Sequence, residues 1–72
     1  MDKRQYNAML DELKTLPVPG TILYPPKDKV NGDKLLRYEI DEEGIKAIMQ
    51  FGPYCEGYWL LEQVRMCTWD KN

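Results

Sequence analysis

The chain has 72 residues, with 12 acidic and 10 basic side chains, a formal net charge of −2 and no histidine. This length allows one domain over residues 1–72, whose core buries only about 60% of the surface of the unfolded chain. The near balance of charge is atypical of a general nucleic-acid binder, which is usually basic. No apolar run approaches the ~20 residues that a membrane span needs.

The two cysteines and the first residues set expectations about the compartment. Cys55 and Cys67 cannot complete a four-ligand thiolate zinc site, so we expect no metal or other cofactor. The residues after Met1 are polar rather than apolar, unlike a secretory signal. We therefore expect a cytoplasmic protein with two free thiols. Self-association would be a further way to stabilise so small a core, and a homodimer is left open.

Residues 2–16 predict an amphipathic helix. Its apolar side chains recur at helical spacing and form one stripe: Tyr6, Met9, Leu10, Leu13 and Leu16. Asp2 can cap the start of this helix, and Pro17 ends it because proline cannot continue the hydrogen-bond ladder. The stripe favours a helix packed on a sheet over a helix that binds a partner.

Residues 21–24 form a short β-rich run between Gly20 and the pair Pro25-Pro26. Two prolines at its exit indicate an edge strand, because proline cannot donate to a ladder. The following residues, 25–33, predict a loop that carries both signs of charge.

Residues 34–51 allow two interpretations. Leu36, Tyr38 and Ile40 alternate with charged residues, and a second alternating run begins after Gly44, which predicts a hairpin. The alternative is a helix over 42–51. The hairpin is preferred because Gly44 costs a helix up to about 1 kcal/mol against alanine, whereas a turn uses it.

The last element is predicted as a strand over 58–61, and residues 62–69 fit either its continuation or a helix. The fold class is therefore α+β, with the N-terminal helix packed on a small, curved, mostly antiparallel sheet. The Pro-Gly-Thr strand start, the acidic-Gly hairpin and the Gly-Tyr-Trp strand resemble those of SH3-like barrels, which implies a half-barrel.

Half of the eight aromatic residues fall within nine positions, from Phe51 to Trp59. Aromatic anchors beside polar groups in a Gly/Pro-rich loop are typical of interface hot spots. We expect Phe51 and Trp59 to fill the core. The partner-binding residues are predicted to be Tyr54, Glu56 and Tyr58, with Trp69 extending them.

Catalysis is not expected, because no histidine is present and no base lies near Cys55 in the sequence. An alternative function is a single-stranded nucleic-acid-binding module, with Lys34, Arg37 and Lys46 on the sheet face as phosphate contacts. The competing explanation for this face is a cross-strand ion pair of Glu39 with Lys46.

The sequence thus predicts a small non-catalytic interaction or regulatory protein that binds a macromolecular partner, most simply a protein, through the Phe51–Trp59 loop. No membrane association is expected. The size and the lack of catalytic signatures resemble those of small accessory proteins of phages and mobile elements, which implies the host cytoplasm.

Overall fold

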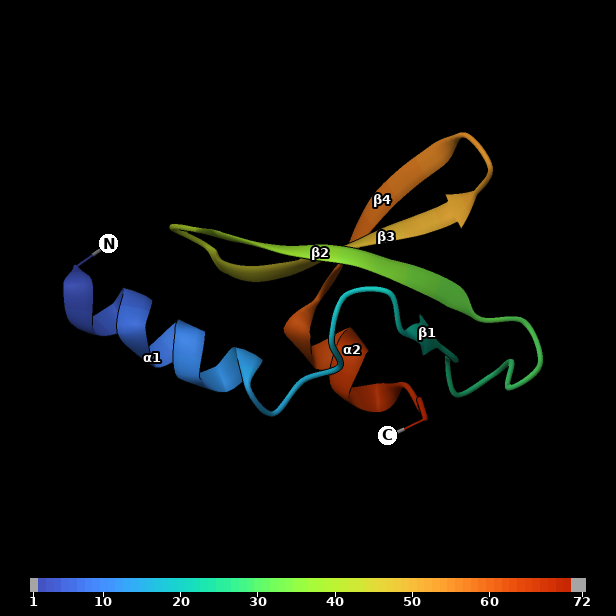
Figure 1. The fold of residues 1–72 in the computed structure, drawn as a ribbon, viewed down its shortest axis with the longest axis horizontal. Helices are drawn as coiled ribbons and strands as arrows, with labels where there is room; N and C mark the ends of the chain where they lie inside the picture. Colours follow the sequence, from blue (N-terminus) through green and yellow to red (C-terminus); the bar gives the residue numbers. More distant parts are fainter. Residues whose placement is uncertain (1, 71–72) are drawn as a thin grey trace.

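The computed structural model describes residues 2–70 and contains two helices and four strands (Figure 1). In chain order they are α1 (Lys3–Leu13), β1 (Ile22–Leu23), β2 (Asp33–Asp41), β3 (Gly44–Gly52), β4 (Cys55–Leu60) and α2 (Leu61–Met66). The strands form one antiparallel sheet in the order β1-β2-β3-β4, which curls into a half-barrel. The predicted α+β class is confirmed.

Helix α1 begins at a capping box, in which two backbone donors are satisfied reciprocally. The amide of Gln5 donates to Asp2 Oδ1 at 2.9 Å, and the amide of Asp2 donates to Gln5 Oε1 at 3.3 Å. Short i→i−3 bonds tighten residues 14–16 before Pro17. The helix therefore ends at Leu13, three residues earlier than the sequence predicts.

The apolar stripe of α1 is covered only at its C-terminal end. Leu16, in the turn after the helix, belongs to the buried core, and Leu13 packs against that core. Tyr6 and Leu10 remain 45% and 39% exposed. An ion pair between Glu12 and Arg65, at 3.5 Å, joins α1 to α2.

Strands β2 and β3 form the predicted hairpin, and the alternative helix over 42–51 is not present. The pair Asp41–Gly44 closes the turn, and the Asp41 side chain accepts the Glu43 amide at 2.8 Å. Gly44 has a φ of +125°, a conformation that a residue with a Cβ adopts only with strain.

A β-bulge interrupts the pairing of β2 with β3. Leu35 faces Met49 and Arg37 faces Ile48, so Leu36 is the extra residue. Leu35 is fully buried and Leu36 is half-buried. The alternation predicted from Leu36 to Ile40 agrees with the burial of these residues, but the bulge also places Leu35, outside that pattern, in the core.

Strand β4 begins at Cys55, three residues before the predicted start at Tyr58. The Phe51–Trp59 segment is therefore a β-hairpin with its turn at Pro53-Tyr54, rather than a loop. The chain then turns into α2, where the amide of Leu60 donates to Gln63 Oε1 at 3.0 Å. Of the two possibilities for residues 62–69, the helix is formed, as far as Met66.

The core lies between the concave face of the sheet and α2 (Figure 1). Its fully buried larger side chains come from β1, β2, β3 and α2: Leu23, Leu35, Met49 and Val64. Strand β1 is an edge strand, as its two prolines predict. Just beyond it, Tyr24 and Thr68 exchange two backbone hydrogen bonds of 2.9 Å, which bring the segment after α2 onto this edge.

Tyr38 ties the sheet to the connection between α1 and β1. Its hydroxyl donates to the carbonyl oxygen of Pro17 at 2.7 Å, across 21 positions of sequence. Burial raises the pKa of Tyr38 to about 12. The phenol therefore stays protonated, and stays a donor, well into the alkaline range.

Replacing Tyr38 by phenylalanine removes this donor and leaves the Pro17 carbonyl without it. We expect Tyr38→Phe to lower the free energy of unfolding by about 1 kcal/mol, measured by urea denaturation at neutral pH. An unchanged free energy would show that the hydrogen bond contributes nothing to the fold.

The same group gives an alkaline pH dependence. The pKa of Tyr38 is about 12 in the folded chain and about 10 in the unfolded chain. Its contribution is complete below about pH 10 and is lost as the pH rises toward 12. Over that range the stability of Tyr38→Phe should fall less steeply than that of the parent chain; equal slopes would contradict this.

Candidate functional site

The convex face of the sheet carries five of the seven candidate functional residues, all except Tyr54 and Trp69. Strand register and side-chain alternation place three rows of residues across β2, β3 and β4 on this face. The rows are Lys34–Gln50–Glu56, Arg37–Ile48–Tyr58 and Glu39–Lys46–Leu60. We call these nine residues the outer face. Residues from both predicted sites, partner-binding and nucleic-acid-binding, thus lie together.

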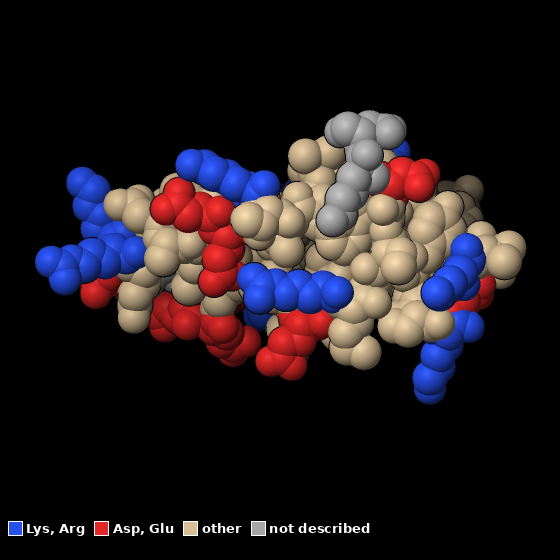
Figure 2. Space-filling view, turned by 90° about the horizontal axis from the view of Figure 1, so that it is seen from below, with Lys and Arg blue, Asp and Glu red and all other residues tan. Residues whose placement is uncertain are grey.

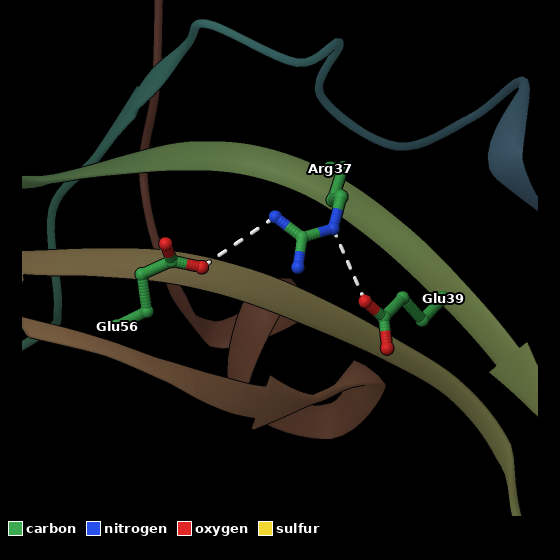
Figure 3. Close-up of polar contacts among 3 residues, drawn as sticks. All are labelled: Arg37, Glu39 and Glu56. Atoms are coloured by element: carbon green, nitrogen blue, oxygen red, sulfur yellow. Dashed lines mark hydrogen bonds and ion pairs between the residues drawn. The ribbon is translucent and has the colours of Figure 1, made fainter.

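Arg37 lies between two carboxylates on the outer face (Figure 3). Its Nε lies 3.1 Å from Glu39 Oε2 and its Nη1 lies 3.5 Å from Glu56 Oε1, on the far side of β3. All three side chains are more than half exposed. Pairs so exposed are worth about 0–1 kcal/mol each, so their main effect is to neutralise one another's charge.

Lys46 is also held by two carboxylates. Its Nζ lies 3.0 Å from Asp41 Oδ2 and 3.2 Å from Glu43 Oε2, both near the β2–β3 turn. These hydrogen bonds raise the pKa of Lys46, and the bond from Lys46 lowers the pKa of Asp41. The ammonium also lies 5.2 Å from the centre of the Tyr58 ring. Glu39 and Lys46 face each other in the β2–β3 register, but they do not form the predicted ion pair. Glu39 bonds to Arg37, and Lys46 bonds to Asp41.

The charges around the outer face therefore nearly cancel. Lys34, at its end, is exposed. Three cations, Lys34 included, are matched by four carboxylates from β2, β4 and the β2–β3 turn. The side of the molecule shown in Figure 2 likewise has basic and acidic side chains interleaved. Neither side presents the continuous basic surface that attracts a phosphate backbone.

Two tyrosines of the aromatic segment are accessible. Tyr54, at the turn of the β3–β4 hairpin, is 99% exposed, and Tyr58, on the outer face, is 55% exposed. In Figure 1 this hairpin projects away from both helices. Glu56 is exposed between them along β4, with its carboxylate bonded to Arg37. Three of the four predicted partner-binding residues are thus on one hairpin.

The other two aromatic residues of this segment pack together. The ring centres of Phe51 and Trp59 are 5.8 Å apart with the planes at 43°. Trp59 is half-buried against the core, whereas Phe51 stays 38% exposed. The core-filling role expected for both is therefore only partial for Phe51.

Phe51 lies over Gly57 of the neighbouring strand. A Cβ at Gly57 would be in steric conflict with Cε2 of the Phe51 ring and 2.8 Å from its Cδ2. Phe51 is also the extra residue of a second bulge, between Gln50 and Gly52. The bulge and the glycine together let the ring lie across β4 toward Trp59.

Trp69 does not extend this surface. It packs against the core and lines a hollow beside Leu16, Pro17 and Val18, in the connection between α1 and β1. The structure thus separates Trp69 from the hairpin that carries Tyr54, Glu56 and Tyr58.

The two thiols are free and differ in environment. Cys55 is exposed at the start of β4, and Cys67 is buried after α2, with its Sγ 3.2 Å from the carbonyl oxygen of Gln63. Burial raises the pKa of Cys67, with the charge of Asp33 adding to the effect. A raised pKa keeps the Cys67 thiol protonated and unreactive.

Comparisons with protein-family models, with curated proteins and with solved structures found no match to this chain. Within residues 2–70, no three Cys, Asp or Glu side chains are grouped so that they could hold a metal ion. No helix in that part of the chain has the length and apolar character to cross a membrane.

Sequence reasoning missed two parts of the outer face. Ile48 and Leu60 bring apolar surface beside Tyr58, and Leu60 is 50% exposed. The alternation of Lys46, Ile48 and Gln50 places Ile48 on the same side as Lys46, so this signal was available. Alternation likewise places Leu60 on the side of Tyr58, but which residues of β3 share that side depends on the pairing of β4 with β3.

The contact of Phe51 with Gly57 can be tested by a double-mutant cycle. Gly57→Ala should displace the Phe51 ring and lower the free energy of unfolding by about 1 kcal/mol. In the Phe51→Ala background the same change should cost clearly less, because no ring remains to be displaced. Equal costs in the two backgrounds, measured by urea denaturation, would contradict the contact.

Proposed function

We propose that the chain is a small, non-catalytic interaction or regulatory protein that binds a protein partner through the exposed side of its β3–β4 hairpin. The observation that carries the proposal is the exposure of Tyr54, which is 99% accessible at the turn, close in sequence to the 55% accessible Tyr58. Tyrosine covers much area at a low entropic cost and is enriched in interface hot spots.

The surroundings of Tyr58 support a protein partner. Ile48 and Leu60 provide apolar area on the same face, and Glu56 and Arg37 provide a polar rim. An apolar centre with polar groups around it is the usual composition of a protein interface. The nucleic-acid alternative has less support, because Arg37 and Lys46 are each engaged by two carboxylates.

The biological setting is part of the proposal. A chain of 72 residues with one exposed aromatic hairpin suits a small accessory protein of a phage or another mobile element, which acts on a host protein in the cytoplasm. The binding surface comprises Tyr54, Glu56 and Tyr58.

Site-specific photocrosslinking in the organism that encodes the chain tests this function. A photoreactive phenylalanine at position 54 should give an adduct with another protein. The same residue at position 30 should not, although Val30, in the loop before β2, is 84% exposed. An adduct whose mass equals two copies of the chain would report self-association and is not evidence of a different protein partner.

Competition then tests the tyrosines themselves. Excess parent chain should suppress the adduct, and a Tyr54→Ala/Tyr58→Ala chain should need an at least about tenfold higher concentration, since hot-spot truncations cost about 2 kcal/mol or more. Circular dichroism should show that the variant remains folded. Equal competition by the two chains, or no adduct specific to position 54, would contradict the proposed function.

A further inference from the structure

The two edges of the sheet are protected to different degrees. Strand β1, at one edge, has only two residues, is followed by Pro25-Pro26 and is continued by the Tyr24–Thr68 bridge. Short edge strands, prolines and covering segments are the devices that keep an edge from pairing with another chain. Strand β4, at the other edge, has six residues.

The open side of β4 can be assigned residue by residue. The amide of Leu60 donates to the Gln63 side chain, so it points away from β3. Because backbone groups alternate in direction along a strand, the amides and carbonyls of Glu56 and Tyr58 point the same way. Among the backbone hydrogen bonds of the described residues, none joins this side of β4 to another segment.

Strand β4 also lacks the usual deterrents to pairing. It contains neither proline nor lysine, and the bulge of this hairpin is at Phe51 on β3. Its only charged residue is Glu56, whose carboxylate is bonded to Arg37. Two such strands side by side would therefore meet little electrostatic repulsion.

We propose that β4 pairs antiparallel with β4 of a second copy of the chain, so that two sheets continue into one across a two-fold axis. The unpaired amides and carbonyls of Glu56 and Tyr58 are spaced to form hydrogen bonds with another extended strand. The β4 strand of a second copy has the same length and the same alternation of outward-pointing backbone groups. An isologous contact of this kind closes on itself and leaves only the protected β1 edge of each copy at the ends of the sheet.

The pairing has a consequence for the outer face. Side chains on one face of a sheet stay on that face when a strand is added at the edge. The outer faces of the two copies would therefore become continuous, with Tyr58 of each copy near the axis. This inference rests on backbone groups, whereas the proposed partner binding rests on tyrosine side chains, so either can fail without the other.

Sedimentation equilibrium of the full chain tests the dimer. From about 1 μM to about 1 mM, the range of weak to moderate association, the average mass should rise from 8.5 kDa toward twice that value. A mass of 8.5 kDa at every concentration would overturn the proposal.

Backbone chemistry tests which edge is used. A synthetic chain with an N-methyl group on the Tyr58 amide keeps the side chain and, because that amide faces away from β3, keeps the β3–β4 pairing. We expect dimerisation to weaken at least about tenfold through the lost donor and the added bulk. An unchanged dimerisation constant would overturn the assignment to β4.

Hydrogen exchange of the parent chain keeps the test independent of any variant. The amides of Glu56 and Tyr58 should exchange more slowly as the concentration rises, while the amide of Lys34, outside the proposed interface, should not change. Concentration-independent exchange at Glu56 and Tyr58 would overturn the proposal even if a dimer were present.

Discussion

The pairing register of β2 with β3 is the constraint on which the rest of the structure depends. Two features set it: the Asp41–Gly44 turn at one end and the bulge at Leu36 toward the other. This register turns Leu35, Ala47 and Met49 toward the core and Arg37, Lys46 and Ile48 toward solvent. A shift by one residue would exchange the two faces, because side chains alternate with a period of two.

The candidate site follows from the same register. Strand β4 pairs with β3, so the register that faces Arg37 with Ile48 also brings Arg37 within reach of Glu56 across the sheet. The carboxylates near Arg37 and Lys46 leave the outer face with little net charge, and Ile48, Tyr58 and Leu60 add aromatic and apolar surface to it. The proposal of a protein partner rather than a nucleic acid rests on the engagement of Arg37 and Lys46 by two carboxylates each.

Much of the fold could be predicted from the sequence, because the signals are local. The apolar spacing of α1, the cap at Asp2, the turn at Gly44 and the edge position of β1 each depend on a few adjacent residues. The bulges at Leu36 and Phe51 could not be predicted, since each depends on the partner strand. The start of β4 at Cys55 was missed because Glu56 and Gly57 are poor strand formers on their own.

The candidate site was predictable only in part. Exposure of Tyr54 follows from its place in a turn, whereas the separation of Trp69 from the hairpin depends on how the segment after α2 returns to β1. The placement of Glu56 and Tyr58 on one face with the predicted cations Lys34, Arg37 and Lys46 required the strand order. The pairing of the strands, which sequence periodicity does not predict, therefore determines which residues share the candidate site.

A comparison of Leu35→Ala with Leu36→Ala tests this account most directly. The bulge makes Leu35 fully buried and leaves Leu36 half-buried, although the two are adjacent and chemically identical. Leu35→Ala should lower the free energy of unfolding by about 2–5 kcal/mol, the range for a buried leucine, and Leu36→Ala by less than half as much. Urea denaturation of the two variants supplies both values, and an equal or larger loss for Leu36→Ala would contradict the register.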